Sequence, residues 1–340
     1  MPDTDSQPVD ALLLVSFGGP ERPEDVLPFL ENVARGKAIP RQRLLEVAEH
    51  YHHFGGKSPI NDQNRALIHA LEVDLASHGL KLPIYWGNRN WHPLLPATLR
   101  QMGAHGVRRA LALFTSAYSS YSGCRQYLEN IAAAQAEVGP SAPRVDKLRA
   151  FFNHPGFIAA MTERMREAFE RLPTDRRAAA RLLYTAHSIP LSMATNCRYE
   201  AQLLEACRLV SQELDRPTWD LTYQSRSGPP TQPWLGPDVA DRLRELIATG
   251  VRDVVLAPIG FVSDHLEVLY DLDIEAKQLC DELGVNMVRA ATVGTHPRVI
   301  AMYRDLIVER MSGLSDRPSL GQFGPSHDVC AADCCPSGRR

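Results

Sequence analysis

The chain has 340 residues, of which 44% are hydrophobic, and its 37 basic and 40 acidic residues leave a net charge of −3. This composition suffices for one large or two medium domains, and the near-balanced charge gives no general case for nucleic-acid binding. No window approaches 18 uninterrupted apolar residues, so no transmembrane segment is predicted. Seven cysteines dispersed through so long a chain do not resemble a secreted disulfide framework, and the cytoplasm is the expected compartment.

Strand-like apolar runs alternate with amphipathic helical patterns almost from end to end. Such alternation predicts an α/β fold with mostly parallel sheets built from right-handed crossover units. The expected strands are 11–17, 83–87, 109–115, 181–186, 220–224, 253–259 and 287–293, with a marginal strand near 147–152. The expected helices include 63–78, 156–171, 200–214, 239–249 and 264–283.

The pattern divides into two halves of about four strands each. A flexible N-terminus is expected at residues 1–9, since it is short and polar and lacks the apolar core of a secretion signal. The helix at 156–171 and the charged segment after it mark the junction, so we expect domains at 10–172 and 173–314. From residue 315 to 340 Pro, Gly, Ser and Cys dominate, which predicts an ordered or metal-pinned tail without a helix.

A histidine stands where one of the expected strands ends. In Leu182-Leu-Tyr-Thr-Ala-His187-Ser-Ile-Pro190 an apolar run leads directly to His187. Open α/β sheets bind ligands at the carboxyl ends of their strands, so His187 is placed for function. The alternative is a strand-end histidine that only bonds a backbone carbonyl, and position alone leaves both open.

Three carboxylates recur every four residues in the helix expected at 264–283. Glu267, Asp271 and Glu275 form one acidic stripe on an α-helix, and Ser263 or Asp264 is expected to cap that helix. The stripe starts beside a strand end, where it could guide a divalent cation or relay protons. A solvated acidic face is the alternative.

His187 and Glu267 together would offer one imidazole and one carboxylate. Such ligands suit Fe(II), Mn(II), Co(II) or Zn(II) held loosely with open positions. Both groups are also reasonable proton acceptors near neutral pH. This is the chemistry needed to exchange two N–H protons for a metal ion.

Several dispersed motifs stand out along the chain. They are Ser16-Phe-Gly-Gly-Pro20, Phe54-Gly-Gly-Lys-Ser58-Pro59, Ala186-His187-Ser-Ile-Pro190, Tyr223-Gln-Ser225 with Pro233-Trp-Leu-Gly-Pro237, and Ser263-Asp-His-Leu-Glu267-Val-Leu-Tyr-Asp271. These motifs, in this order, resemble the ferrochelatases over residues 10–312. The stretch 116–127 is most similar to the actinobacterial branch of that family, which inserts iron into coproporphyrin III and also carries C-terminal cysteines.

The resemblance implies a class II chelatase fold, with two Rossmann-like domains around a porphyrin cleft. It implies an enzyme of haem biosynthesis that inserts Fe(II), its substrate, into a porphyrin. His187 and Glu267 would handle metal and protons, and we expect them to face each other across a cavity wide enough for a tetrapyrrole. Asp271 and Glu275 would extend a polar path toward the surface.

The resemblance also implies residues that contact the porphyrin. Ser58 and Tyr127 fall at positions that contact it in related bacterial enzymes, and Tyr51 is a further candidate for the opposite face. Some relatives carry a tyrosine after the first strand, where this chain has Phe17. A phenolate ligand from that position is therefore excluded.

Three cysteines of the tail lie close together in sequence. Thiols clustered in a polar tail favour a metal or a disulfide over simple burial. By resemblance, Cys124, Cys330, Cys334 and Cys335 hold a 2Fe–2S cluster, which takes four thiolates. A structural zinc or an oxidised disulfide is the alternative. The other cysteines, Cys197, Cys207 and Cys280, fall in helical patterns and are expected to be packing residues.

The actinobacterial likeness favours coproporphyrin III over protoporphyrin IX as substrate. A cobalt chelatase of the same fold class is disfavoured by the motifs at 234–237 and 263–265. A non-catalytic iron–sulfur or haem carrier on a chelatase scaffold would bind porphyrin without metalating it. Pathway analogy adds a coproheme decarboxylase as a transient partner, and association with a membrane surface is left open.

Overall fold

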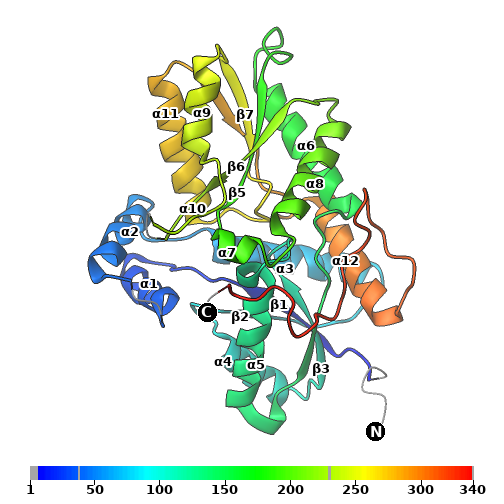
Figure 1. The fold of residues 1–340 in the computed structure, drawn as a ribbon. Helices are drawn as coiled ribbons and strands as arrows, with labels where there is room; N and C mark the ends of the chain where they lie inside the picture. The colour runs from blue at the N-terminus through cyan, green and yellow to red at the C-terminus, as the bar shows by residue number, and fades with distance from the viewer. Residues whose placement is uncertain (1–6, 37–38, 229–230, 339–340) are drawn as a thin grey trace. The chain divides into compact units, whose positions relative to one another are not determined.

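The computed structural model describes residues 7–36, 39–228 and 231–338, so most of the expected flexible N-terminus, residues 1–9, lies outside the described residues. The chain forms two compact units (Figure 1). The first contains the chain up to Thr115, Gln126–Arg149 and Tyr303–Asp316. The second contains Ser116–Arg125, Ala150–Met302 and the tail from Arg317.

The first unit contains a four-stranded parallel sheet in the order β2-β1-β3-β4. Every residue of β1 and β3 is buried, as expected for parallel strands covered on both faces. The strands are β1 (Ala11–Ser16), β2 (Ile84–Asn88), β3 (Arg109–Phe114) and β4 (Arg144–Lys147).

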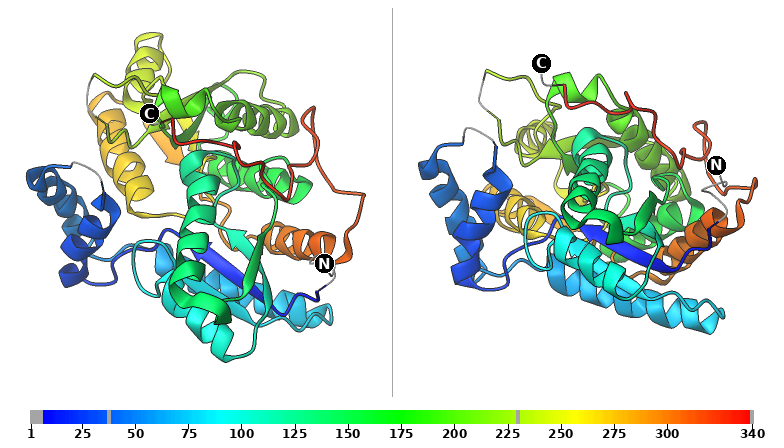
Figure 2. Two further views of the ribbon diagram at one scale, coloured as in Figure 1. Left: turned by 60° about the horizontal axis from the view of Figure 1, so that its bottom comes forward. Right: turned by 90° about the horizontal axis from the view of Figure 1, so that it is seen from below.

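Helices cover both faces of this sheet (Figure 2). α3 places Leu67 and Leu71 against Leu12 and Leu14 of β1, while α4 packs against β2 and α5. The helices are α1 (Val26–Ala34), α2 (Arg41–His53), α3 (Ile60–Ser77), α4 (Leu95–Ala104), α5 (Gln126–Val138) and the part of α12 (Pro297–Ser312) from Tyr303 onward, with single turns η1 (Pro23–Asp25) and η3 (Gly139–Ser141). The earlier residues of α12 belong to the second unit.

The second unit repeats the architecture with a parallel sheet in the order β6-β5-β7-β8. Helices α6 and α8 lie on one face, and α9, η4 and α11 lie on the other (Figure 1). The strands are β5 (Arg181–His187), β6 (Trp219–Gln224), β7 (Asp253–Ala257) and β8 (Asn286–Arg289). The helices are α6 (Pro155–Glu170), α7 (Leu191–Ala194), α8 (Tyr199–Glu213), α9 (Val239–Ala248), α10 (Leu266–Val268), η4 (Leu269–Ala276) and α11 (Lys277–Glu282), with a π-turn η2 (Tyr121–Arg125).

The two parallel sheets flanked by helices confirm the predicted α/β class. All seven expected strands are present, although β8 ends at Arg289, short of the expected residue 293. The marginal strand at 147–152 was wrong, because β4 ends at Lys147. Beyond it, the backbone N–H groups of Phe151 and Phe152 donate to the Ala117 carbonyl oxygen and so follow a loop instead of the sheet.

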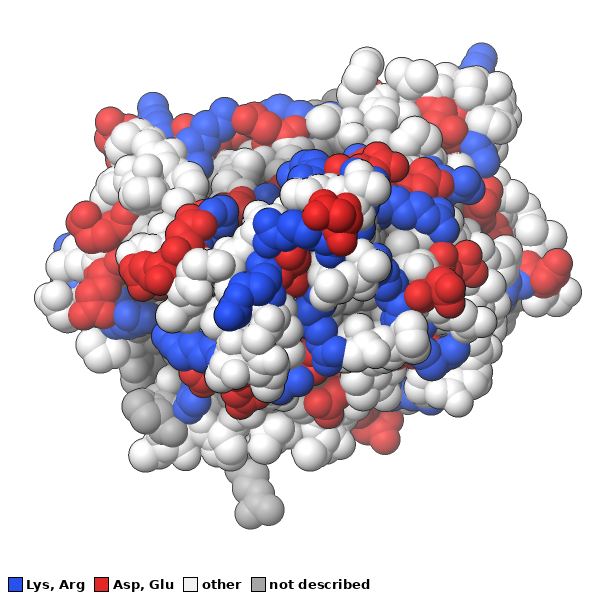
Figure 3. Space-filling model, turned by 90° about the horizontal axis from the view of Figure 1, so that it is seen from above, with Lys and Arg blue, Asp and Glu red and all other residues white. Residues whose placement is uncertain are grey.

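The units divide the chain at points other than the expected boundary between residues 172 and 173. The helix expected at that junction, α6, packs against α8 and β7 of the second unit. On the face drawn in Figure 3, basic and acidic side chains are interspersed in small groups. Among the described helices, none combines the length and apolar composition that a membrane crossing requires.

Candidate functional site

The structure brings His187 and Glu267 into direct proximity in the second unit. His187 is the last residue of β5, and it pairs with Gln224, the last residue of β6. The His187 Nε2 lies 3.8 Å from a carboxylate oxygen of Glu267, and the two side chains are 34% and 52% exposed. We expected a cavity wide enough for a tetrapyrrole between them, and that expectation was wrong. Since 3.8 Å leaves no room for a macrocycle, the two side chains cannot lie on opposite faces of one.

The backbone around His187 is held by hydrogen bonds. The His187 Nδ1 lies 2.5 Å from the Ser188 carbonyl oxygen, to which it donates, and Nε2 is the ring nitrogen that faces Glu267. The Tyr199 hydroxyl donates to the His187 carbonyl oxygen at 3.1 Å. Thus one ring nitrogen satisfies a backbone carbonyl, as in the simpler interpretation, while the other remains available to a proton or a metal.

The helix expected at 264–283 is divided into three pieces. A short α10 leads into the π-helix η4 and then into α11. In a π-helix each N–H donates to the carbonyl five residues earlier, and such segments occur frequently at functional sites. Leu272 and Ala276 of η4 lie in the apolar core of the second unit. The π-helical segment therefore still packs one side against that core.

The cap of this helical segment also differs from the expectation. Neither Ser263 nor Asp264 caps it: the His265 side chain accepts from the Val268 N–H at 3.3 Å. Asp264 instead pairs with Arg289 at 3.1 Å. Burial lowers the pKa of His265, and the nearby His187 lowers it further against the opposing effect of Glu267. His265, which the sequence analysis did not single out, is therefore harder to protonate than an exposed histidine.

Asp271 is the half-buried member of the acidic row. Burial raises its pKa to about 7, and the carboxylates of Glu267 and Glu275 contribute in the same direction. Two hydrogen bonds oppose this shift: one from the Ser225 hydroxyl, and one from the Gln224 amide at 3.3 Å. Ser225 adopts a φ of +60°, a left-handed conformation that costs a residue with a side chain about 1–3 kcal/mol.

The exposed Glu275 is the third member of the row. Desolvation of its carboxylate raises its pKa, and the charge of Asp238 adds to the effect. Because Glu267 and Glu275 both act on Asp271, the three carboxylates form one electrostatically coupled row. The row leads from the His187–Glu267 pair along η4.

The three residues expected to contact porphyrin all lie in the first unit and are buried. Tyr51, Ser58 and Tyr127 are 8%, 2% and 5% exposed. Ser58 lies against Gly19, where an added Cβ would come within 2.7 Å of the Ser58 Cβ. This close approach leaves no room for a side chain at residue 19, which explains the glycine there.

An aromatic cluster connects the two tyrosines. Tyr51 packs on Phe29, which packs on Phe17, with ring centroids 5.8 and 6.2 Å apart. The Arg89 guanidinium lies 4.5 Å from the Tyr127 ring centroid and 5.8 Å from that of Phe17. Phe17 and Arg89 directly follow the carboxyl ends of β1 and β2, and Phe17 is 36% exposed. The cluster is thus a partly open aromatic surface at a ligand-binding edge.

The tail is ordered without helix or strand over its described residues, as predicted. The Asn153 amide donates to the carbonyl oxygens of Leu320 and Gly324 at 3.0 and 2.9 Å. Phe323 packs on Phe152 and lies under the Arg198 guanidinium, 4.6 Å from it. The end of the tail lies beside α7 (Figure 2).

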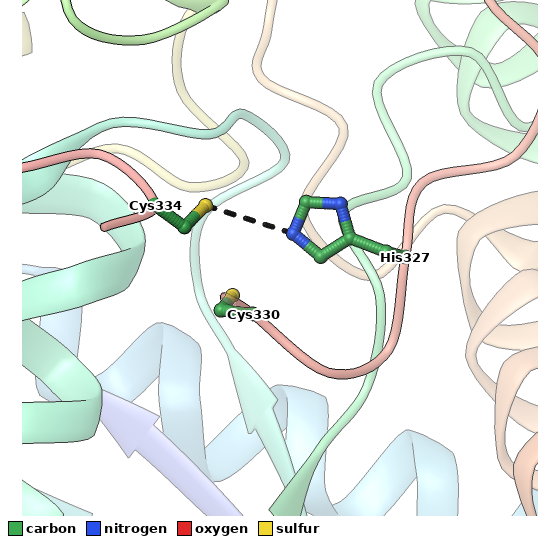
Figure 4. A group of neighbouring side chains, drawn as sticks. All are labelled: His327, Cys330 and Cys334. Atoms are coloured by element: carbon green, nitrogen blue, oxygen red, sulfur yellow. Dashed lines mark hydrogen bonds between the residues drawn. The ribbon is translucent and has the colours of Figure 1, made fainter. Parts of the chain in front are cut away.

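The tail cysteines converge on a histidine that the sequence analysis did not single out. Figure 4 shows His327, Cys330 and Cys334 directed toward one another, with their ligand atoms all within 4.8 Å. The Cys334 Sγ lies 3.7 Å from the His327 Nε2 and 3.6 Å from the Cys335 Sγ. In the sequence, the signal for His327 is its position three residues before Cys330. A search for metal ligands that included histidine as well as cysteine would have identified it.

Two other cysteines are associated with this group. The segment that carries Cys124 reaches the tail through Arg125, whose guanidinium donates to the Ala331 carbonyl oxygen at 3.4 Å. Cys197 lies in a turn between α7 and α8, so the helical assignment was wrong. Burial raises the pKa of Cys197, with a further contribution from Cys334. Cys207 and Cys280 are fully buried packing residues.

Burial also raises the pKa of Cys335, to about 12, and the thiols of Cys334, Cys197 and Cys330 contribute to the shift. A group of neighbouring thiols resists ionisation, since each thiolate would repel the next. A bound cation reverses this preference, because metal coordination deprotonates thiols.

Comparisons with known proteins show the family of the chain. A family model described as Ferrochelatase matches residues 9–311. The chain belongs to the ferrochelatase family. A family member from Rhodopirellula baltica, named ferrochelatase, is 58% identical over 96% of this chain and 93% of its own length. Another from Streptomyces coelicolor, named coproporphyrin III ferrochelatase, is 52% identical over 99% and 96% of the two chains.

Solved structures support the same fold. SirB from Bacillus subtilis with Fe3+ superposes with a TM-score of 0.58 at 10% identity, over 90% of this chain and 96% of that one. The cobalt complex of the sirohydrochlorin chelatase SirB from Bacillus subtilis subspecies spizizenii gives a TM-score of 0.54 at 11% identity, over the same shares. The predicted class II chelatase fold is thus confirmed.

Proposed function

We propose that this chain is an enzyme that inserts Fe(II) into a porphyrin in haem biosynthesis, and that the porphyrin is coproporphyrin III. The observation that carries the proposal is the open His187–Glu267 pair at the carboxyl end of β5 in a chain of this family. Relatives from Streptomyces coelicolor and Streptomyces griseus, 52% and 53% identical, are named coproporphyrin III ferrochelatases. Those names support the choice of substrate.

Metalation exchanges two pyrrole N–H protons for one Fe(II) ion, so the site needs proton acceptors close to the macrocycle. The His187 Nε2 accepts one pyrrole proton, and the Glu267 carboxylate 3.8 Å away accepts the other. One imidazole and one carboxylate bind a divalent ion loosely. This suits Fe(II) as a substrate that must leave for the porphyrin.

Asp271 and Glu275 continue the path for protons or metal. With a pKa of about 7, Asp271 gains and loses a proton readily near neutral pH. It lies between Glu267 and the exposed Glu275 along the acidic row. We assign this row the transfer of protons or of incoming metal between the pair and solvent.

Tyr51, Ser58 and Tyr127 are the porphyrin-contacting residues of the proposal. The aromatic cluster that links the two tyrosines supports it, because Phe17 offers a partly exposed ring to a flat macrocycle. Binding that favours a bent macrocycle would expose the pyrrole lone pairs and promote metalation.

We further propose that Cys124, Cys330, Cys334 and Cys335 hold a 2Fe–2S cluster. The donor chemistry fits, because the cluster takes four thiolates. Cys334 and Cys335 lie 3.6 Å apart at their sulfurs, and Arg125 ties the loop of Cys124 to the tail. When bound, the cluster supplies a redox-active cross-link between that loop and the tail, whereas metal insertion transfers no electrons.

Absorption spectroscopy tests the cluster. The protein purified without air is expected to be red-brown, and Cys124→Ser should abolish the visible absorption. The control Cys280→Ala, at a cysteine buried in α11, should leave the spectrum unchanged. A colourless wild-type protein loaded with zinc would contradict the cluster.

Anaerobic Fe(II) insertion into coproporphyrin III and protoporphyrin IX tests the function. We expect a kcat/KM at least about tenfold higher for coproporphyrin III, because a hydrogen bond to each additional carboxylate contributes about 1.5–3 kcal/mol. His187→Ala should lower the insertion rate at least about 100-fold while porphyrin binding is retained. His69→Ala, at an exposed residue of α3, is the matched control.

Each outcome of this experiment decides a different part of the proposal. Equal or faster metalation of protoporphyrin IX would overturn the substrate. Porphyrin binding without metalation of either compound would indicate a carrier and overturn the enzyme. Normal turnover in His187→Ala would refute the assignment of that residue.

Coproporphyrin III as substrate has one consequence for the pathway. The iron product would retain four propionates, so a decarboxylating enzyme must act on it. We propose a coproheme decarboxylase as a transient partner and the cytoplasm as the compartment. Recovery of such an enzyme with this chain after cross-linking in cells tests the partnership, and its absence from the cross-linked material would contradict it.

A further inference from the structure

The end of the tail holds one histidine and three cysteines within nine residues, His327 to Cys335. Three of them, His327, Cys330 and Cys334, place one ligand atom each within 4.8 Å of the others (Figure 4). The fourth, Cys335, lies 3.6 Å from Cys334 between sulfur atoms. The iron–sulfur proposal uses the three cysteines and leaves the histidine without a role.

Two separations among these atoms, from Cys334 to His327 and from Cys334 to Cys335, match the edges of a small tetrahedron. With metal–sulfur bonds of about 2.3 Å and metal–nitrogen bonds of about 2.0–2.1 Å, a tetrahedral ion separates two sulfurs by about 3.8 Å and sulfur from nitrogen by about 3.5 Å. The measured separations are 3.6 Å between Cys334 and Cys335, and 3.7 Å between Cys334 and His327. A two-iron cluster instead divides its ligands into two pairs on opposite sides of its core.

The backbone supports convergence of the two adjacent cysteines. Side chains of neighbouring residues in an extended chain point to opposite sides. Cys335 has a φ of +52°, a left-handed conformation that is costly for a residue with a side chain and clusters at ligand sites. With this backbone conformation the two sulfurs lie 3.6 Å apart.

We propose that His327, Cys330, Cys334 and Cys335 bind one tetrahedral divalent ion, Zn²⁺ or Fe²⁺, without any contribution from Cys124. Three thiolates and one imidazole form a closed donor set typical of structural sites for such ions. The ion cross-links residues 327–335, a stretch beyond the contacts of Asn153 and Phe323 that hold the earlier part of the tail.

This site and the cluster share three cysteines and differ in one ligand. The single ion uses His327, whereas the two-iron cluster uses Cys124. A chain without its cluster therefore still holds a metal in its tail. Metal binding by these four residues of the tail is independent of iron insertion into porphyrin.

Cobalt binding to the metal-free full-length protein tests the site. Tetrahedral Co²⁺ absorbs strongly in the visible range, and thiolate coordination adds a sulfur-to-cobalt charge-transfer band that the His187–Glu267 pair cannot produce. We expect Cys124→Ser to bind one Co²⁺ with both signals, and one equivalent of Zn²⁺ to remove them. Adding His327→Ala to Cys124→Ser should weaken binding more than about 100-fold, since loss of a second-shell partner alone costs about 10–100-fold.

The matched control adds His69→Ala to Cys124→Ser and should leave the Co²⁺ spectrum unchanged. X-ray absorption of zinc-loaded Cys124→Ser should show one nitrogen at about 2.0 Å and three sulfurs at about 2.3 Å. The proposal is overturned if Cys124→Ser lacks the charge-transfer band or if His327→Ala leaves its affinity unchanged. Iron insertion measured on the same proteins reports separately on the proposed function.

Discussion

Among the single residues of the site, Asp271 shows most clearly how environment sets chemistry. It has the same carboxylate as Glu267 and Glu275, yet only its pKa reaches about 7. Burial provides most of this shift, and hydrogen bonds from Ser225 and Gln224 limit it. The Thr185 hydroxyl donates to the side-chain oxygen Oε1 of Gln224 at 2.9 Å, which leaves the side-chain nitrogen Nε2 to donate to Asp271.

Asp271→Asn should make the protein more stable at alkaline pH. The folded pKa of about 7 lies above the ordinary value of 3.8, so the ionised carboxylate costs stability. That cost is absent below about pH 4, increases with pH and is complete above about pH 7. The variant should therefore gain up to a few kcal/mol at pH 8 and nothing near pH 4.

Urea unfolding at both pH values measures this difference. Asp241→Asn, at an exposed position on α9, should change the unfolding midpoint little at either pH. Fe(II) insertion should slow in Asp271→Asn, because an amide does not accept the proton. A gain of equal size at pH 4 and pH 8 would show that the carboxylate charge is not its cause.

At the scale of elements, η4 joins the core to the acidic row. Its buried face contributes Leu272 and Ala276 to a cluster with Leu243 and Leu246 of α9. Its other face carries Asp271 and Glu275. Because the two faces share one short helix, loss of apolar packing should shift the carboxylates as well.

Leu272→Ala should lower the free energy of unfolding by about 2–5 kcal/mol, the usual cost of a leucine-sized cavity in a core. Leu272 is 0% exposed, whereas Leu283, just after α11, is 44% exposed. Leu283→Ala should therefore cost no more than about 0.5 kcal/mol. Denaturant unfolding of both variants makes the comparison, and equal costs would mean that η4 is not held by its apolar face.

At the scale of the whole molecule, the chain comprises two sheet units and a tail that belongs to the second. The tail has no regular structure over its described residues and depends on a few side chains. Asn153 and Phe152 hold it on one side, and the Glu205 carboxylate accepts from the Gln322 N–H at 3.0 Å. The cysteines follow these contacts in the chain, and Arg125 adds a hydrogen bond to the Ala331 carbonyl oxygen among them.

Phe323→Ala should loosen the tail, since it removes the ring that packs between Phe152 and Arg198. We expect amide hydrogen exchange over residues 317–335 to increase severalfold and the yield of metal in the tail to fall. Val329→Ala, at a side chain that is 77% exposed, is the control. If both variants exchange like the wild type, the ring does not anchor the tail.

Much of the fold could be predicted because its signals are local. Seven strands and the parallel α/β class follow from short apolar runs that alternate with helical periodicity. The wrong predictions also have physical reasons. β4 was misplaced because its sequence, Arg144–Lys147, is polar, and the π-helix was missed because its four-residue repeat of carboxylates also fits an α-helix.

The sequence by itself determined which residue types stand at strand ends, which segments are apolar and which family the chain resembles, since these depend on neighbouring residues and motif order. Only the tertiary structure decided that His187 and Glu267 lie side by side, that burial tunes Asp271 and that His327 joins the tail cysteines. Those facts depend on which distant segments pack together and how much water they exclude. Neither quantity is contained in any short stretch of the chain.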